Sequence, residues 1–292
     1  MYEGYGEHVS YGDGKKIVLS LVRKRRHYYY FDEQNDDFAN DGIKGSPTPS
    51  GFEYFPKNIL YRFFKPIVYY LFLIVVAIFV RPLSGLRRVH NKNVLRKLRD
   101  PKKGYFVFGN HTNMFADALL QPVVSFPRQV FLVSHPDAIS IPGMKTFLRM
   151  LGAVPIPCVK STYTNYTSAI SRMYEKGHPI VVYPEAHIWP KYNKIRDFSD
   201  VSFKLPVRLD APCFVKSTVY HRSRWGWTYP EVWFDGPFYP NVELSEKQAQ
   251  KELRDRVYAQ LALRCMDSEA DECYHYEKVD SPELVRTEID VL

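Results

Sequence analysis

The sequence predicts an α/β fold in which a mostly parallel sheet is flanked by helices and preceded by an N-terminal membrane-associated helix. After Gly104, apolar runs of strand length alternate with helical segments, which is typical of parallel strands joined by helical crossovers. Two of these runs end in polar residues, at Asn110-His111 and at Glu185, as expected for an active site at the carboxyl ends of strands. Ahead of them, residues 66–80 form an uninterrupted apolar run that is followed by a basic segment.

The length of 292 residues fits one catalytic domain of about 200 residues with appendages. Residues 1–57 are polar and rich in turn-forming residues, and within them residues 45–51 have the Gly, Ser and Pro content of a linker. We therefore expect a polar N-terminal extension and linker at residues 1–57 and a membrane-anchoring helical segment at residues 58–84. The catalytic domain is expected at residues 85–265, and a flexible acidic tail at residues 266–292.

The apolar run is short for a membrane span. As a helix, its 15 residues extend about 22 Å, compared with a hydrocarbon core of about 30 Å. Residues 59–65 would lengthen the helix if Arg62 and Lys65 extended their charged ends to the interface. A spanning helix and a half-embedded anchor both fit this pattern, and a buried core helix is the alternative. Residues 81–103 contain nine Lys or Arg and a single acid, Asp100, which favours a membrane location with the enzyme on the cytoplasmic face.

The formal net charge of +8 predicts a negatively charged partner, which could be nucleic acid, an anionic membrane or an anionic substrate. None of the motifs of nucleic-acid-binding folds occurs, so we expect membrane lipids and no nucleic acid as partners. The basic patch at residues 23–26 could contact RNA or a membrane, but it is also typical of a solvated edge, and we assign it no chemistry. No pattern predicts an oligomeric state. Neither a metal site nor a disulfide framework is expected, because no paired C-x-x-C spacing connects Cys158, Cys213, Cys265 and Cys273.

The alternating region predicts five strands, at residues 105–108, 130–133, 154–157, 180–183 and 213–219. Helices are expected between them, at residues 113–123, 144–151, 166–175 and 203–209. The aromatic-rich residues 225–238 are expected to supply edge strands, with a turn at Asp235-Gly236-Pro237. Ser245 and Gln248 have the spacing of a capping box and predict a helix that begins there and carries Ala249, Leu253, Val257 and Leu261 on one face.

His111 is the candidate general base, and Asp117 is the carboxylate expected to orient it. A spacing of six residues on one regular helix would place the two side chains far apart around the axis. We therefore expect His111 in the loop before the helix, with Thr112 or Asn113 as the N-cap and Asp117 pointing back from the first turn. A structural histidine is the alternative.

The motifs around these residues resemble those of the glycerophospholipid acyltransferase family, which is typified by lysophosphatidic acid acyltransferase. Asn110-His111 and Asp117 are similar to the first motif, although the His to Asp spacing is one residue longer than in the family pattern. The later blocks follow in the family's order, as Ile141-Pro142-Gly143 with Leu151-Gly152-Ala153-Val154-Pro155-Ile156-Pro157, then Tyr183-Pro184-Glu185, then Ala211-Pro212-Cys213-Phe214-Val215. The resemblance implies a glycerolipid acyltransferase-like α/β fold.

Two departures from the family pattern fall at its phosphate-binding arginines. Cys158 stands where the second block has an arginine, and Ala186-His187-Ile188 stands where the third block has Gly-Thr-Arg. Basic residues near these blocks could replace the arginines, Arg196 best of all because its guanidinium binds phosphate through two nitrogens. Solvated surface charges are the alternative. Besides the catalytic pair, the expected substrate-binding residues are Asn110, Glu185, Lys160, His187, Lys194 and Arg196, and Lys191 is a further basic candidate.

The resemblance implies transfer of a fatty acyl group from acyl-CoA or acyl carrier protein to a hydroxyl of a lysophospholipid such as 1-acylglycerol 3-phosphate, in phospholipid biosynthesis. No cofactor or metal is implied beyond the acyl donor. His111 would take the proton from the hydroxyl, Asp117 would stabilise the imidazolium, and Glu185 would help to place the acceptor. A serine hydrolase is not expected, because the chain has no G-x-S-x-G sequence. A catalytically weak, lipid-binding member of the same family is the alternative function.

Overall fold

The structure, a computed structural model, describes residues 7–11, 15–19, 24–38, 52–139, 143–225, 227–269 and 274–291. The expected linker at residues 45–51 lies outside these ranges, as do Ile141 and Pro142. The chain divides into two compact units, one formed by residues 33–270 and the other by residues 1–32 together with residues 271–292.

The larger unit is built on a seven-stranded sheet with the order β4-β10-β9-β5-β8-β6-β7. Five neighbouring strands, β9, β5, β8, β6 and β7, run parallel, while β10 is antiparallel to β9 and parallel to β4. The sheet confirms the predicted fold class. The strands are β4 (Arg88–His90), β5 (Tyr105–Gly109), β6 (Phe131–Ser134), β7 (Ala153–Pro155), β8 (Pro179–Val182), β9 (Cys213–Arg222) and β10 (Thr228–Phe238).

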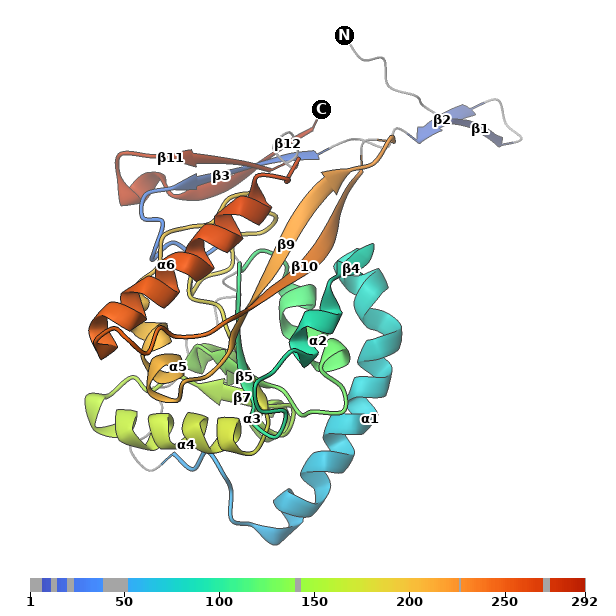
Figure 1. Cartoon of the computed structure of the whole chain (residues 1–292). Helices are drawn as coiled ribbons and strands as arrows, with labels where there is room; N and C mark the ends of the chain where they lie inside the picture. The colour runs from blue at the N-terminus through green and yellow to red at the C-terminus, as the bar shows by residue number, and fades with distance from the viewer. Residues whose placement is uncertain are drawn as a thin grey trace. The chain divides into compact units, whose positions relative to one another are not determined.

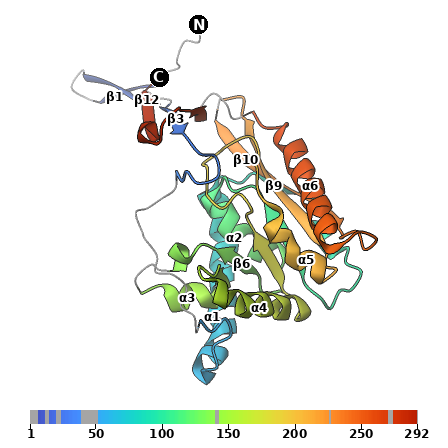
Figure 2. The same ribbon diagram turned by 90° about the vertical axis from the view of Figure 1, so that its left-hand side faces the viewer.

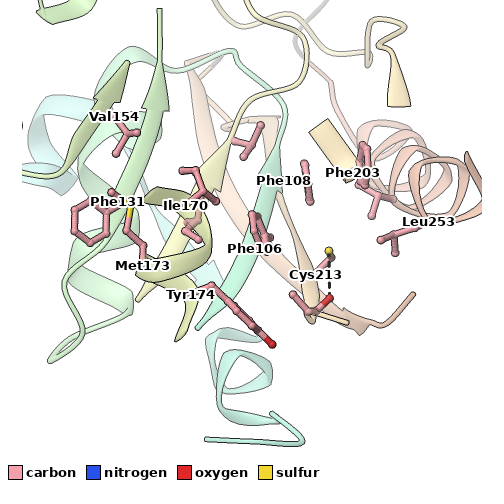
Figure 3. Packing of buried hydrophobic residues seen from close by; sticks show 14 of the residues in the cluster. Phe106, Phe108, Phe131, Val154, Ile170, Met173, Tyr174, Phe203, Cys213 and Leu253 are labelled. Atoms are coloured by element: carbon pink, nitrogen blue, oxygen red, sulfur yellow. Dashed lines mark hydrogen bonds between the residues drawn. The ribbon is translucent and has the colours of Figure 1, made fainter. Parts of the chain in front are cut away.

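Helices cover both faces of this sheet (Figures 1 and 2). Side chains of β5 alternate between the faces. Phe106 and Phe108 pack with α4, α5 and α6 (Figure 3), while Tyr105 and Val107 pack with α1 and α2 on the other face. The helices are α1 (Ile59–Ser84), α2 (Met114–Val124), α3 (Lys145–Met150), α4 (Tyr163–Glu175), α5 (Lys204–Arg208) and α6 (Glu246–Cys265). Short 3-10 turns are found at Lys92–Arg96, Pro136–Ile139, Lys160–Thr162 and Asp200–Phe203.

The five predicted strands correspond to β5, β6, β7, β8 and β9, and the four predicted helices to α2, α3, α4 and α5. The helix after Ser245 is confirmed as α6, with its capping box formed and its four expected apolar residues buried. The expectation for residues 225–238 is wrong in two respects. These residues supply one strand, β10, that lies second from the edge, because the unpredicted three-residue β4 pairs with its outer side. The predicted turn at Asp235-Gly236-Pro237 is an irregularity within β10, where the register with β9 shifts between Asp235 and Phe238.

Helix α1 has 26 residues and is long and apolar enough to cross a membrane. Among the described residues, it is the one helix with that length and composition. Asn58 caps its start by accepting hydrogen bonds from the backbone N–H groups of Leu60 and Tyr61. Gly85, with φ of 67°, ends it in the left-handed conformation that glycine adopts readily. One stripe of the helix, formed by Tyr69, Leu73, Val76, Val80 and Ser84, is buried. The rest of its large apolar side chains are mostly exposed.

The smaller unit contains the two ends of the chain in a three-stranded sheet. Its central strand is β3 (Lys24–Tyr30), which pairs parallel with β11 (Tyr274–Lys278) and antiparallel with β12 (Arg286–Val291). A separate antiparallel pair is formed by β1 (Glu7–Tyr11) and β2 (Lys15–Leu19). Within the expected flexible tail at residues 266–292, Tyr274–Lys278 and Arg286–Val291 are strands, and the polar extension before residue 57 also contributes strands. Tyr28, which is buried, stacks on Tyr276 with ring centroids 4.6 Å apart. The acidic composition of residues 266–292 did not indicate this packing contact.

Leu253 tests the packing of α6 on the sheet. Its side chain is fully buried, so we expect Leu253→Ala to lower the free energy of unfolding by about 2–5 kcal/mol through lost burial and a residual cavity. Denaturant unfolding followed by circular dichroism measures this change. Lys251→Ala, at an exposed position of the same helix, is the control and should change stability by less than about 0.5 kcal/mol. A similar small change for Leu253→Ala would contradict the packing described.

Candidate active site

The candidate site begins where β5 ends. Gly109 is its last residue, and a Cβ atom there would lie 2.8 Å from Cε1 of Tyr183 and 3.1 Å from the backbone oxygen of Lys216. Only glycine therefore lets the Tyr183 ring approach this strand end. The next residue, Asn110, is buried and bonded to β9, since its side-chain oxygen accepts from the Thr218 N–H and its amide donates to the Thr218 carbonyl, at 2.8 and 2.9 Å. Asn110 fixes the direction in which the chain leaves the sheet.

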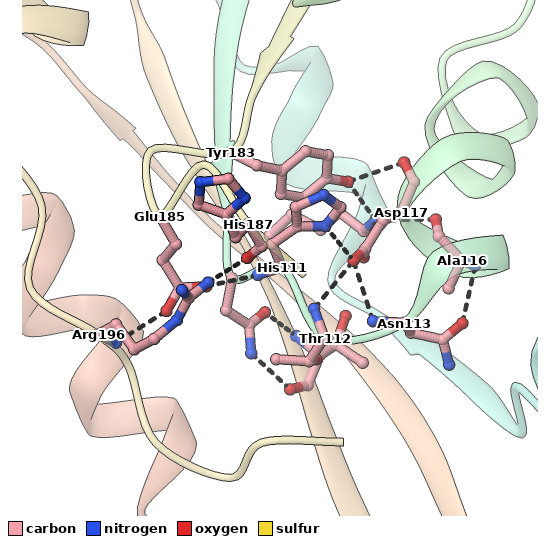
Figure 4. A network of polar contacts seen from close by, with 12 residues as sticks. His111, Thr112, Asn113, Ala116, Asp117, Tyr183, Glu185, His187 and Arg196 are labelled. Atoms are coloured by element: carbon pink, nitrogen blue, oxygen red, sulfur yellow. Dashed lines mark hydrogen bonds and ion pairs between the residues drawn. The ribbon is translucent and has the colours of Figure 1, made fainter. Parts of the chain in front are cut away.

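His111 and Asp117 meet as the sequence predicted. His111 lies in the loop before α2, Asn113 is the N-cap, and Asp117 sits in the first helical turn. Nδ1 of His111 is 2.9 Å from Oδ2 of Asp117. Because an ionised carboxylate only accepts hydrogen bonds, Nδ1 carries the hydrogen and Nε2 is left as the basic nitrogen. Figure 4 shows the pair with its neighbours.

Asp117 is buried and receives hydrogen bonds from several elements. The backbone N–H groups of Thr112 and Asn113 each donate to Oδ2 at 3.0 Å, and Nζ of Lys216 donates to Oδ1 at 3.2 Å. Burial alone would raise the pKa of Asp117, but Lys216, His111 and the Asn113 N–H outweigh it and hold the pKa below its usual range. Asp117 is therefore a permanent anion at neutral pH and can stabilise a protonated His111.

Tyr183 packs against one face of the His111 imidazole. Its ring stacks on that of His111 with centroids 4.5 Å apart and an interplanar angle of 17°. The hydroxyl donates to the Asp117 carbonyl at 2.8 Å and accepts from Nζ of Lys216 at 2.9 Å. Burial, and then the charge of Asp117, raise the pKa of Tyr183 well above its usual value, so the hydroxyl stays protonated.

Glu185 holds the backbone of the site. Its Oε2 accepts the His111 N–H at 2.7 Å and its Oε1 accepts the Arg196 N–H at 2.8 Å. The Arg196 guanidinium lies 3.7 Å from the same carboxylate and also donates to the carbonyls of Glu33 and His187. Burial raises the pKa of Glu185, against the opposing effects of Arg196 and the His111 N–H.

These contacts correct two sequence expectations. Arg196, expected to bind a substrate phosphate, is 2% exposed and has its guanidinium turned toward Glu185 and chain carbonyls. Asn110, expected to contact substrate, is 1% exposed and bonded to β9. Both residues shape the site from inside, because an interior charged or amide group must be satisfied by internal partners.

The other predicted residues lie in more open positions. His187 is half-buried, with Nδ1 3.5 Å from Oδ2 of Asp37. Lys160 and Lys194 are exposed, Lys160 at the 3-10 turn before α4 and Lys194 in the loop after β8. The same loop is joined to the segment that carries His111 by two backbone hydrogen bonds, in which the N–H groups of Trp189 and Lys191 donate to the His111 and Thr112 carbonyls at 3.0 and 2.9 Å.

Sequence reasoning missed Lys216 and the role of Tyr183. The signal for Lys216 was a single lysine in the apolar strand Cys213-Phe214-Val215-Lys216, since a central parallel strand seldom buries a charge without a partner. Tyr183 was noted only as part of a motif. Within the described ranges, no group of three or more His, Cys, Asp or Glu is placed to hold a metal ion.

The segment that forms the site matches a known protein family. Residues 86–217 match the model of the acyltransferase family, and that segment contains His111, Asp117, Glu185 and Lys216. Among solved structures, the chain is similar to the 1-acyl-sn-glycerophosphate (LPA) acyltransferase PlsC from Thermotoga maritima, with 15% identity and a TM-score of 0.41 over 69% of this chain and 93% of that one. A comparison with curated proteins found no match.

The buried pair of Glu185 and Arg196 gives a test of the site's framework. Glu185→Gln leaves the Arg196 cation buried without its carboxylate, so we expect a loss of about 3–5 kcal/mol of stability. Glu246→Gln is the matched control, because Glu246 pairs with Arg208 at the surface and should contribute less than about 1 kcal/mol. Denaturant unfolding of both variants decides the matter, and equal effects would show that Glu185 does not hold the framework.

Proposed function

We propose that this chain, whose residues 86–217 match the model of the acyltransferase family, transfers a fatty acyl group from a thioester donor to a hydroxyl of a lysophospholipid. The observation that carries the proposal is the pairing of His111 with the buried anion of Asp117, in a site that leaves Nε2 as the base. Neither a nucleophilic side chain nor a cofactor is required for this reaction, since a thiolate is a good leaving group.

In the proposed mechanism, the acceptor hydroxyl attacks the thioester carbonyl while Nε2 of His111 takes its proton. Asp117 stabilises the imidazolium that results, and Tyr183 keeps the ring from turning away. Collapse of the tetrahedral intermediate expels the thiolate, which recovers the proton from His111. Backbone N–H groups are proposed to stabilise the oxyanion.

We propose acyl-CoA or acyl carrier protein as the donor and 1-acylglycerol 3-phosphate as one acceptor to test. With Arg196 occupied by Glu185, the acceptor's phosphate would be bound by exposed cations, of which Lys160 and Lys194 lie at the two blocks that depart from the family pattern. His187, half-buried after Glu185, is a further candidate contact.

Membrane association is proposed from the exposed face of α1. Phe63, Ile67, Leu71, Ile74 and Ile78 are each at least 42% exposed although they are large and apolar. Leu83 at the end of α1 and Met114 and Phe115 at the start of α2 are also exposed, which extends apolar surface to the helix that carries Asp117. Asn113 links the two helices by donating to the Ser84 carbonyl at 3.1 Å. An acyl chain could therefore reach the base from a bilayer. The basic residues after α1 favour the cytoplasmic face.

A lipid-binding protein without turnover is the second candidate, favoured by one observation. Cys158 is exposed where the family pattern has an arginine, and Ile188 replaces the other arginine and is buried. A site with weakened phosphate binding could retain lipid without positioning its hydroxyl.

Turnover is tested by thiol release from palmitoyl-CoA in detergent, with lysophosphatidic acid, other lysophospholipids or glycerol 3-phosphate as acceptor. We expect acceptor-dependent release by the wild type and a loss of about 10²–10⁴-fold in His111→Ala, the range of general-base catalysis. His275→Ala, outside the segment that matches the family, should keep the wild-type rate.

The acceptor that gives the fastest release identifies the substrate class. If no acceptor supports release, acyl carrier protein replaces CoA as the donor. If neither donor supports acyl transfer and the protein still binds lysolipid, the lipid-binding function would replace the proposed enzymatic function.

Membrane association is tested by flotation with vesicles that contain anionic lipid. We expect the wild type to float and the double substitution Ile74→Glu with Ile78→Glu to float much less, because two charges would enter the apolar interface. Val242→Glu is the control, since Val242 is also an exposed apolar residue but is not part of α1. Equal flotation of all three proteins would exclude α1 as the anchor.

A further inference from the structure

Lys216 is an ammonium group in the centre of the fold. It lies on β9 opposite Gly109 of β5, and its side chain is 0% exposed. Burying an ammonium ion costs several kcal/mol unless charge and hydrogen bonds compensate for lost water. A lysine at this position therefore needs partners that define its place closely.

The partners number three, one for each ammonium hydrogen. Nζ donates to the Ala116 carbonyl at 2.9 Å, to Oδ1 of Asp117 at 3.2 Å and to the Tyr183 hydroxyl at 2.9 Å. They come from the first turn of α2 and from the residue that follows β8. One side chain thus joins three elements that are separate in the sequence.

Two of these partners are the groups that hold the base. Asp117 bonds Nδ1 of His111 through its other oxygen, and the Tyr183 ring lies flat against the imidazole. We propose that Lys216 is a positioning residue of the acyl transfer, which locks Asp117 and Tyr183 around His111 and shares the Asp117 charge with the imidazole. The effect of Lys216 on turnover rests on the proposed function, whereas its effect on Asp117, Tyr183 and His111 does not.

The shared charge has a consequence that packing alone would not produce. Burial lowers the pKa of Lys216 while Asp117 opposes that change, so the ammonium remains tied to the carboxylate. Removing the cation would leave Asp117 with His111 as its main cationic partner, which favours the protonated imidazole. The base would then become available only at higher pH. Among the described residues, the other ionisable groups near the site include Tyr183 and Glu185 after β8, His187 in the same loop, Arg196 against Glu185, and Tyr220 of β9, whose hydroxyl bonds the Thr112 carbonyl.

The test compares Lys216→Met, Lys216→Arg and the surface control Lys251→Met in the full chain. For Lys216→Met we expect kcat to fall at least about tenfold, KM to change less than about threefold, and the acid limb of the pH profile to move up by about one pH unit. Lys216→Arg keeps the positive charge, but a guanidinium cannot donate to all three partners from one nitrogen as Nζ does. It should therefore lower kcat without moving the acid limb. Lys251→Met should match the wild type.

A second measurement does not depend on turnover. Nuclear magnetic resonance titration of labelled histidine rings, assigned with His111→Ala, should show the His111 midpoint displaced to higher pH in Lys216→Met and unchanged in Lys251→Met. If the wild type shows no turnover, the proposed function fails while this titration still decides the role of Lys216. Should Lys216→Met not fold, Lys216→Gln replaces it in both measurements. An unmoved titration, or an unmoved acid limb with unchanged kcat, would overturn the proposal.

Discussion

The buried carboxylate of Asp117 is the group on which the arrangement of the site depends. An ion taken out of water must be stabilised where it lies, and this one is held by two backbone N–H groups at the start of α2, by His111 and by Lys216. The backbone donors require α2 to begin directly after its N-cap, Asn113. Lys216 requires β9 to lie beside β5 in its observed register. The orientation of the base is therefore a result of helix capping and sheet register together.

The two interior carboxylates of the site behave differently. Asp117 has a lysine at 3.2 Å and several donors, and the balance lowers its pKa. Glu185 has its guanidinium partner at 3.7 Å, and burial prevails, which raises its pKa. Asp117 acts on the ring of His111 and Glu185 on its backbone N–H. The first contact suits charge stabilisation during the proposed proton transfer, and the second suits a fixed framework.

Local patterns in the sequence were enough to predict the strands at residues 105–109 and 179–182 and the cap before α2. They were also enough to predict the contact between His111 and Asp117. Each depends on neighbours within about ten residues or on the general rule for strand ends. Lys216 could not be placed this way, because its partners Asp117 and Tyr183 are 99 and 33 residues away and meet only through the strand order. The same holds for β3 and β11, which pair across almost the whole chain. Arg196 was misjudged because a guanidinium near a motif can face inward as well as outward.

The inward use of Arg196 also explains the charge balance of the site. The network of polar contacts around His111 includes two carboxylates, Asp117 and Glu185, and two cationic side chains, Lys216 and Arg196, so the formal charges of these four groups cancel. Taking a proton onto His111 then adds one positive charge to a neutral surrounding. The proposed acyl transfer would create one negative charge at the same moment, on the oxyanion of the tetrahedral intermediate. A site that begins neutral can therefore stabilise the ion pair of imidazolium and oxyanion without first binding a counterion, and an additional inward-facing cation would have opposed protonation of the base.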